Sequence, residues 1–297
     1  MKIGVRAHDY GKRPAAELAS GIAEAGFSCI QLAPAKALPG EHWKPGTWNA
    51  AEVAETRSVF DNSGLRVSVL GCYINPVHPD PDARLAELSR FTECIRFCRD
   101  FGCALVATET GSHNADCSPH PFNRSEESYL ELVESIGTLV GAAEDAGVYV
   151  GVEGVSRHVA HSPARIRRLI DDIRSPVLKV VFDPVNFVEE GSAEEMARIV
   201  GESFDLFGDR IAAIHVKDFL PSPASEGGSR TGPAGEFRVV PPGRGYMSGY
   251  MSGHMFWRKI AEKTGALAAQ PDLIIEDLKP SEMAAAREFV LACWGSV

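Results

Sequence analysis

Short apolar runs alternate with longer amphipathic stretches along the chain. Each apolar run is short enough for one strand, and each amphipathic stretch has the periodicity of a helix. Several helical stretches begin at Pro or Ser and end at Gly. The pattern predicts strands over residues 2–7, 28–33, 66–74, 103–109, 148–153, 177–183, 210–216 and 272–276. It predicts helices over residues 14–26, 49–64, 82–101, 125–147, 162–173, 192–208, near 254–264, and 281–293.

Strands that alternate with helices indicate a parallel sheet, and eight such units indicate an α/β protein with a (β/α)8 TIM barrel. We expect one domain over residues 1–297, because no linker divides the chain. The alternative is an open doubly wound sheet. This alternative is weakened because the first strand leads into RAHDYGK, which does not contain a G-x-G-x-x-G turn. Residues 219–253 are rich in Gly, Pro and Ser, which predicts a long loop.

Composition and charge narrow the class of protein. Of the 297 residues, 44% are hydrophobic and 24% charged, which is ordinary for a globular chain. The net charge is −10 and no polybasic tract is present, which argues against nucleic acid as a partner. No apolar run approaches the roughly 18 residues of a membrane helix, and the N-terminus lacks a signal-peptide core. We therefore expect a cytoplasmic protein that does not bind membranes.

The polar residues that follow the apolar strands carry the chemical signal. In a barrel of this kind the active site lies at the C-terminal ends of the strands. The segments VGVEG, VVFDP, AIHVKD and LIIED each place one metal-binding side chain there, namely Glu153, Asp183, His215 and Glu276. Three carboxylates and an imidazole suit one divalent ion, Mn²⁺, Mg²⁺ or Co²⁺, and Zn²⁺ also fits. The alternative is that each residue only caps the next helix.

Other polar residues near the strand ends are candidates for binding substrate. They are His8, Asn75, Glu109, His158, Asn186 and Lys217. Each also has a structural interpretation: Lys217, for example, can form a salt bridge with a ligand carboxylate, and His158 can brace a neighbouring group. Trp43 and Trp48 lie in the long connection after the second strand and are candidates for an apolar pocket wall.

Several short segments together resemble the xylose isomerase-like TIM-barrel superfamily, in its sugar phosphate isomerase/epimerase branch. They are VEGVSRHVAHSP, FDPVN, HVKD, PPGRG and the final IIED, and the resemblance covers nearly the whole chain. This branch includes ketose 3-epimerases, hydroxypyruvate isomerases and inosose dehydratases. The resemblance implies that Glu153, Asp183, His215 and Glu276 bind the metal. It also implies that Glu153 and Glu276 form the acid/base pair.

The expected function is that of a metal-dependent isomerase or epimerase that removes a proton next to a metal-bound carbonyl of a sugar or sugar phosphate. A lyase that dehydrates an inosose-type cyclic ketone stays open, as does a non-catalytic sugar-binding barrel. The endonuclease branch of the superfamily is disfavoured, because Asn186, Lys217 and Asp218 stand where it needs further metal-binding residues. The expected partner is a small carbohydrate, and a homo-oligomer stays open.

Overall fold

Eight parallel strands form a closed barrel in the computed structural model, which describes residues 1–222, 230–232, 235–249, 252–253 and 255–295. The strand order is β1-β11-β7-β6-β5-β4-β3-β2, and β1 pairs with both β11 and β2 to close the ring. The strands are β1 (Ile3–Arg6), β2 (Cys29–Leu32), β3 (Arg66–Gly71), β4 (Leu105–Glu109), β5 (Tyr149–Glu153), β6 (Leu178–Phe182), β7 (Ile211–Val216) and β11 (Asp272–Ile275). The predicted (β/α)8 TIM barrel is confirmed.

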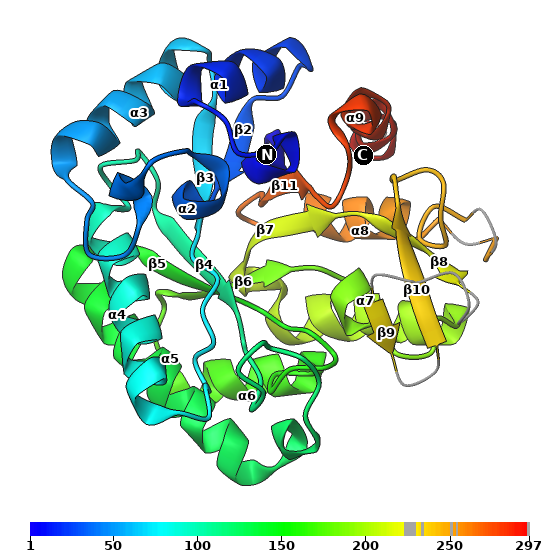
Figure 1. Ribbon diagram of the computed structural model, residues 1–297. Helices are drawn as coiled ribbons and strands as arrows, with labels where there is room; N and C mark the ends of the chain where they lie inside the picture. Colours follow the sequence, from blue (N-terminus) through cyan, green and yellow to red (C-terminus); the bar gives the residue numbers. More distant parts are fainter. Residues whose placement is uncertain (223–229, 233–234, 250–251, 254, 296–297) are drawn as a thin grey trace.

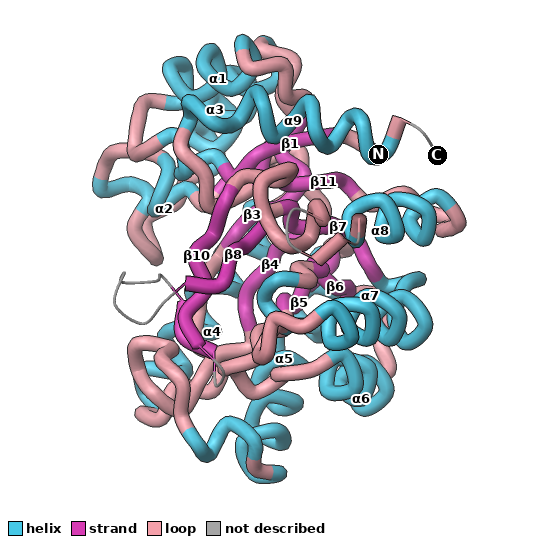
Figure 2. Tube along the Cα trace, turned by 90° about the vertical axis from the view of Figure 1, so that its right-hand side faces the viewer, coloured by secondary structure: helices cyan, strands magenta, loops and turns pink. Residues whose placement is uncertain are grey.

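Helices surround this barrel on the outside (Figures 1 and 2). The longer ones are α1 (Ala15–Glu24), α3 (Ala50–Asn62), α4 (Pro81–Phe97), α5 (Glu126–Ala146), α6 (Pro163–Ile173), α7 (Ala193–Phe207), α8 (Phe256–Gly265) and α9 (Pro280–Trp294). Helices α5, α6 and α7 each begin after a serine whose hydroxyl accepts a hydrogen bond from a backbone N–H of the first turn. All the predicted strands and helices are found, with ends that differ by a few residues.

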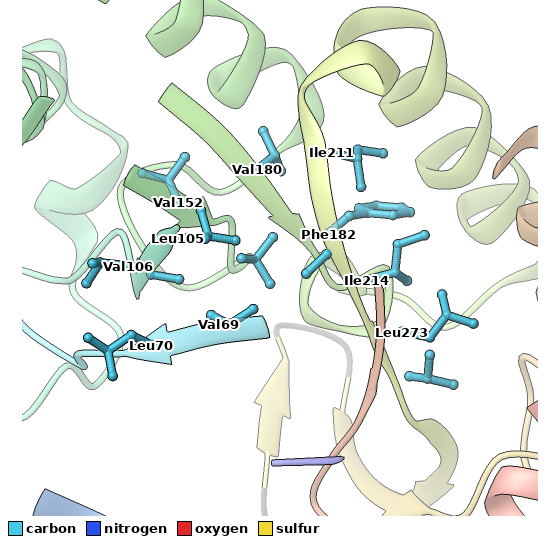
Figure 3. Packing of buried hydrophobic residues seen from close by; sticks show 14 of the residues in the cluster. Val69, Leu70, Leu105, Val106, Val152, Val180, Phe182, Ile211, Ile214 and Leu273 are labelled. Atoms are coloured by element: carbon cyan, nitrogen blue, oxygen red, sulfur yellow. The ribbon is translucent and has the colours of Figure 1, made fainter. Parts of the chain in front are cut away.

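The hydrophobic core follows from this arrangement. Each strand contributes branched or aromatic side chains, and these form one buried cluster with the inner faces of the helices. Figure 3 shows part of it, with Leu105, Val152, Val180 and Ile214 coming from four different strands. The polar residues at the C-terminal ends of the strands are thereby held on a rigid, packed support.

The predicted long loop over residues 219–253 is wrong in part. Its described residues include a three-stranded sheet of order β8-β10-β9, formed by β8 (Asp218–Ser222), β9 (Arg230–Gly232) and β10 (Gly235–Val240). The ring of Phe219 packs edge-on against that of Phe237, with centroids 5.2 Å apart, so apolar pairing overrides the Gly/Pro/Ser composition. Parts of the glycine-rich stretch 225–237 lie outside the described residues.

A short helix, α2 (Pro34–Ala37), immediately follows β2 and lies at the C-terminal end of the barrel. The sequence pattern did not predict it. None of the helices in the described part of the chain is long and apolar enough to cross a membrane.

Candidate metal centre

Four neighbouring strands bring Glu153, Asp183, His215 and Glu276 together. Glu153 ends β5, Asp183 directly follows β6, His215 lies in β7, and Glu276 directly follows β11. One ligand atom from each residue lies within 4.8 Å of the others, and all four side chains are buried. The strand order β11-β7-β6-β5 makes these residues consecutive around the barrel. The side chains that the strand-end pattern picked out therefore converge on one point.

The contacts of His215 show that this point needs a positive charge. The Nε2 atom lies 2.8 Å from the side-chain oxygen of Gln31, so Nε2 carries a proton and donates it. The other nitrogen, Nδ1, lies 3.4 Å from Glu153 Oε2 and 3.3 Å from Glu276 Oε2. Among the described residues, this buried Nδ1 has no hydrogen-bond partner. In a neutral imidazole, the lone pair of Nδ1 would face two carboxylates, and the two would repel each other. A cation between them would remove this repulsion.

Either a proton or a metal ion can supply that charge. Burial alone would lower the pKa of His215, but the carboxylates of Glu276 and Glu153 outweigh it and raise the pKa to about 9. A divalent ion would replace this proton, because histidine binds metals through a deprotonated nitrogen. Carboxylate oxygens and one imidazole nitrogen are ligands suited to Mn²⁺, Mg²⁺, Co²⁺ or Zn²⁺. The residues present therefore fit a metal ion.

Glu276 is held by two cations, one on each oxygen. Lys217 Nζ lies 2.5 Å from Oε1, and Arg6 Nη1 lies 3.0 Å from Oε2. Burial would raise the pKa of Glu276, but the charges of His215, Lys217 and Arg6 together hold it well below the usual range. Glu276 is therefore a fixed carboxylate in this arrangement.

Lys217 links three carboxylates and has no exposure to solvent. Besides Glu276, its Nζ lies 2.6 Å from Asp183 Oδ2 and 3.2 Å from Asp277 Oδ2. These contacts are the salt bridge to a ligand carboxylate that the sequence offered as the structural interpretation of Lys217. A contact between Lys217 and substrate stays a prediction.

Asn186 positions the other two carboxylates. Its side-chain amide donates a hydrogen bond to Glu153 Oε1. Its backbone N–H donates to Asp183 Oδ1 at 3.2 Å, as does that of Val185 at 2.9 Å. Burial raises the pKa of Glu153, and the opposing charge of His215 does not cancel this effect. The two glutamates thus differ: two cations hold Glu276, whereas a neutral amide holds Glu153.

Two further predicted residues lie beside this cluster and contact each other. Glu109 ends β4 and is the register partner of Glu153 on β5. Its Oε2 lies 3.3 Å from Nδ1 of His158, which is buried. The other ring nitrogen of His158, Nε2, donates to the backbone oxygen of Cys117 at 3.2 Å. His158 therefore braces Glu109, and contact of either with substrate stays a prediction.

His8 and Asn75 have mainly structural contacts. The ring of His8 packs edge-on against Tyr73 with centroids 5.8 Å apart. Burial, followed by the charges of Arg6 and Lys36, lowers the pKa of His8 to about 3, so its ring is neutral. The Asn75 amide donates to the backbone oxygens of Ser112 and Asn114 at 2.8 and 3.0 Å. This amide joins the segments that follow β3 and β4.

Sequence reasoning missed three polar residues around the site, Arg6, Gln31 and Lys36, and it placed Tyr73 at the end of the third strand without giving it a role. Arg6 and Gln31 are polar residues inside apolar strands, which was the available signal. Gln31 is almost fully buried and also donates to the Tyr73 hydroxyl at 2.9 Å, so it joins Tyr73 to His215. Nothing in the local sequence distinguished Lys36 from other lysines.

The two tryptophans predicted to form an apolar wall lie together. The rings of Trp43 and Trp48 pack edge-on with centroids 5.8 Å apart. Both line a small cavity of about 90 Å³ that also touches Lys36 and Tyr73. A contact of the tryptophans with substrate stays a prediction.

We expect a divalent ion to raise the thermal midpoint of the chelator-treated protein. At 100 times its Kd, bound Mn²⁺ would stabilise by about 2.7 kcal/mol, which for a chain of 297 residues corresponds to roughly 4 °C. Differential scanning calorimetry measures the shift. Asp183→Asn keeps the side-chain oxygen that accepts from Val185 and Asn186 but removes the charge, and should lose most of the shift.

Asp272→Asn is the matched control for this measurement. Asp272 is another buried aspartate on the same barrel, bonded to Ser68 and to the backbone N–H of Lys2, and it is not part of the ligand cluster. Its variant should keep the metal-dependent shift, whatever its own midpoint. An unchanged shift in Asp183→Asn would contradict the assignment of Asp183 as a ligand.

Comparison with known proteins places the chain among related barrels. A family model described as "Xylose isomerase-like TIM barrel" matches residues 20–287. No protein of curated function matches the sequence significantly.

The fold is similar to that of several solved structures. One is a xylose isomerase domain protein from Planctomyces limnophilus, with 20% identity and a TM-score of 0.72 over 100% of this chain and 97% of that one. A xylose isomerase-like TIM barrel protein from Mycobacterium smegmatis, in complex with magnesium, has 16% identity and a TM-score of 0.68 over 99% and 97%. A D-psicose 3-epimerase, in the presence of D-fructose, has 16% identity and a TM-score of 0.71 over 99% and 100%. At sequence identities of 16–20%, the similarity to these structures supports a shared fold alone.

Proposed function

This chain belongs to the xylose isomerase-like TIM-barrel family, and from that premise we propose that it is a divalent-metal-dependent isomerase or epimerase of a sugar-type ketone. One observation carries the proposal: Glu153, Asp183, His215 and Glu276 are buried with ligand atoms within 4.8 Å, and Nδ1 of His215 faces two of the carboxylates. Such a buried acidic cluster is costly unless a cation compensates it. The likeness to an epimerase fold adds support.

The four residues of the cluster would hold the ion, and their own partners keep them in place. When bound, such an ion would supply Lewis-acid chemistry at a ketone oxygen, which would make the adjacent C–H proton easier to remove. Lys217 and Arg6 fix the carboxylate of Glu276, and Asn186 fixes that of Glu153. Because these carboxylates are positioned before substrate arrives, little reorganisation is needed.

Glu153 and Glu276 are the residues that would move the proton. Their strands, β5 and β11, are separated in the barrel order by β6 and β7, so the two carboxylates approach the site from different sides. One carboxylate takes the C–H proton, and either the same one or the other returns it. Return of the proton by the same carboxylate suits an isomerase. Return of the proton from the opposite side inverts the configuration at the carbon and suits an epimerase.

Exchange with solvent deuterium tests this proposal. The Mn²⁺-loaded protein is incubated in D2O with ketoses, keto sugar acids and inososes, and the products are analysed by NMR and mass spectrometry. We expect deuterium at the carbon next to the carbonyl, and no exchange in chelator-treated protein. The labelled carbon separates an epimerase from an isomerase, and loss of water identifies a lyase. The absence of exchange throughout the panel, in protein shown to hold its metal, would refute the proposal.

A further inference from the structure

Asp9 contacts two groups that adjoin Glu276. It follows β1 in the short 3-10 helix Ala7–Tyr10, and its side chain is 8% exposed. Its Oδ1 accepts hydrogen bonds from Nε and Nη2 of Arg6 at 3.0 and 2.7 Å. Its Oδ2 accepts from the backbone N–H of Asp277 at 2.8 Å. One carboxylate therefore binds both the arginine that contacts Glu276 and the residue that follows Glu276.

Arg6 carries the first of these contacts to one particular oxygen of Glu276. Its Nη1 donates to Glu276 Oε2 at 3.0 Å, and this oxygen lies 3.3 Å from Nδ1 of His215. The guanidinium is planar, so the bonds from its Nε and Nη2 to Asp9 fix the direction in which Nη1 points. Lys217 binds the other oxygen, Oε1. The contact of Asp9 therefore bears on the oxygen that faces the middle of the ligand cluster.

The second contact supports the backbone just after Glu276. Asp277 has a φ of 60°, in the left-handed region that residues other than glycine seldom occupy. Its side chain contacts Arg6 and Lys217, but these contacts leave its backbone free to rotate. The bond from its N–H to Asp9 Oδ2 holds the peptide group that joins Glu276 to Asp277. Asp9 thereby fixes the point at which the chain turns away from β11.

Asp9 is ionised at pH 7.5. Burial raises its pKa to about 6, because the charge of Arg6 offsets only part of the effect of burial, and the carboxylates of Glu276 and Asp277 also raise it. The guanidinium of Arg6 is thus shared among three carboxylates. Without Asp9, it would be free to turn toward the two that remain.

We propose that Asp9 is a positioning residue, which sets the orientation of the Glu276 carboxylate through Arg6 and through the peptide group of Asp277. The consequence for the reaction rests on the proposed function, in which Glu276 moves the proton. A group that takes a proton from carbon must be held within about 0.5 Å of its productive position. Asp9 is not part of the ligand cluster, so its effect is transmitted by Glu276.

Two substitutions separate the contacts of Asp9. Asp9→Asn keeps an oxygen that can accept from the N–H of Asp277 but removes the charge that faces Arg6, and Asp9→Ala removes both contacts. We expect kcat for deuterium exchange by the Mn²⁺-loaded protein to fall about 10-fold in Asp9→Asn and roughly 100-fold in Asp9→Ala. KM should change less than about threefold. The Kd of Mn²⁺, measured by isothermal titration, should rise about 10-fold in Asp9→Ala.

Asp272 provides the matched control. It too accepts from a backbone N–H, that of Lys2, and pairs with an arginine, Arg66. However, it is the first residue of β11, at the opposite end of the strand from Glu276. Asp272→Ala should lose stability in urea but keep the Kd of Mn²⁺ and kcat within about twofold. Unchanged values in Asp9→Ala would overturn the proposal, as would equal losses in the two alanine variants.

A double-mutant cycle tests the route through Arg6. In an Arg6→Met background, Asp9→Asn should lower kcat by less than about threefold, although it lowers kcat about 10-fold in the wild-type background. Such a loss of effect is expected only if the charge of Asp9 acts through the guanidinium. Full additivity of the two substitutions would overturn this route.

Crystal structures of the metal-free variants separate this proposal from the proposed reaction. In Asp9→Ala, the carboxylate of Glu276 should lie more than about 0.5 Å from its position in the wild type, whereas in Asp272→Ala it should stay in place. A carboxylate that does not move in Asp9→Ala would overturn the role of Asp9. A lack of exchange with every ketone in the wild type would instead count against the proposed reaction, and the position of the carboxylate would still decide the role of Asp9.

Discussion

Glu276→Gln is expected to slow deuterium exchange at the carbon next to the carbonyl by about three orders of magnitude. The substitution removes a carboxylate that would move the proton, and such groups contribute roughly 10²- to 10⁴-fold. It also removes one negative charge from the candidate metal centre. In addition, a glutamine amide can accept from only one of the two cations that now hold Glu276, Lys217 on Oε1 and Arg6 on Oε2. The exchange rate in D2O, measured by NMR at saturating Mn²⁺, gives the effect.

Asp277→Asn is the matched control for this experiment. Asp277 is the next residue and contacts the same two cations, Arg6 and Lys217, but it is not part of the ligand cluster. Its backbone has a positive φ of 60°, which asparagine tolerates well. We expect less than a tenfold effect. Metal content is measured in both variants, and exchange in metal-loaded Glu276→Gln within tenfold of the wild type would contradict the assigned role.

The fold could be predicted because its signal is local and repeated. Each strand is a short apolar run, each helix has its own periodicity, and the alternation of the two requires a parallel sheet. The ligand cluster could be predicted for a related reason. A barrel places all the C-terminal strand ends on one face, so Glu153, Asp183, His215 and Glu276 converge through topology alone.

Lys217 and Asn186 were named from the sequence, but Arg6 and Gln31, which also support the cluster, were not, because their partners are set by the three-dimensional packing. Arg6 contacts Asp277, which lies 271 positions away in the sequence. Gln31 on β2 contacts His215 on β7, although these two strands are not neighbours in the barrel. The small sheet formed by β8, β9 and β10 was not predicted, because the Gly/Pro/Ser-rich composition is typical of a loop and the contact between Phe219 and Phe237 forms only in the folded chain.

Lys217→Met is expected to destabilise the metal-free protein by about 3–5 kcal/mol, the cost of removing one partner from a buried ion pair. The ammonium of Lys217 has no solvent exposure and lies 2.6 Å from Asp183 Oδ2 and 2.5 Å from Glu276 Oε1. A methionine of similar volume would leave these two buried carboxylates without that charge. Urea unfolding of the chelator-treated proteins measures the difference.

A metal ion should restore much of the loss, because it brings positive charge to the same two carboxylates. The stabilisation by Mn²⁺ should therefore be larger in Lys217→Met than in the wild type, and the two proteins should be closer in stability with the ion than without it. Lys263→Met is the control: its side chain is exposed, lies 3.5 Å from Asp205 and sits 5.8 Å from the centre of the Phe204 ring, so the stability should change little in both states. If Lys217→Met were as stable as the wild type without metal, the ammonium would not be the main compensating charge. If it were unstable but insensitive to Mn²⁺, the ion would have to bind elsewhere than between Asp183 and Glu276.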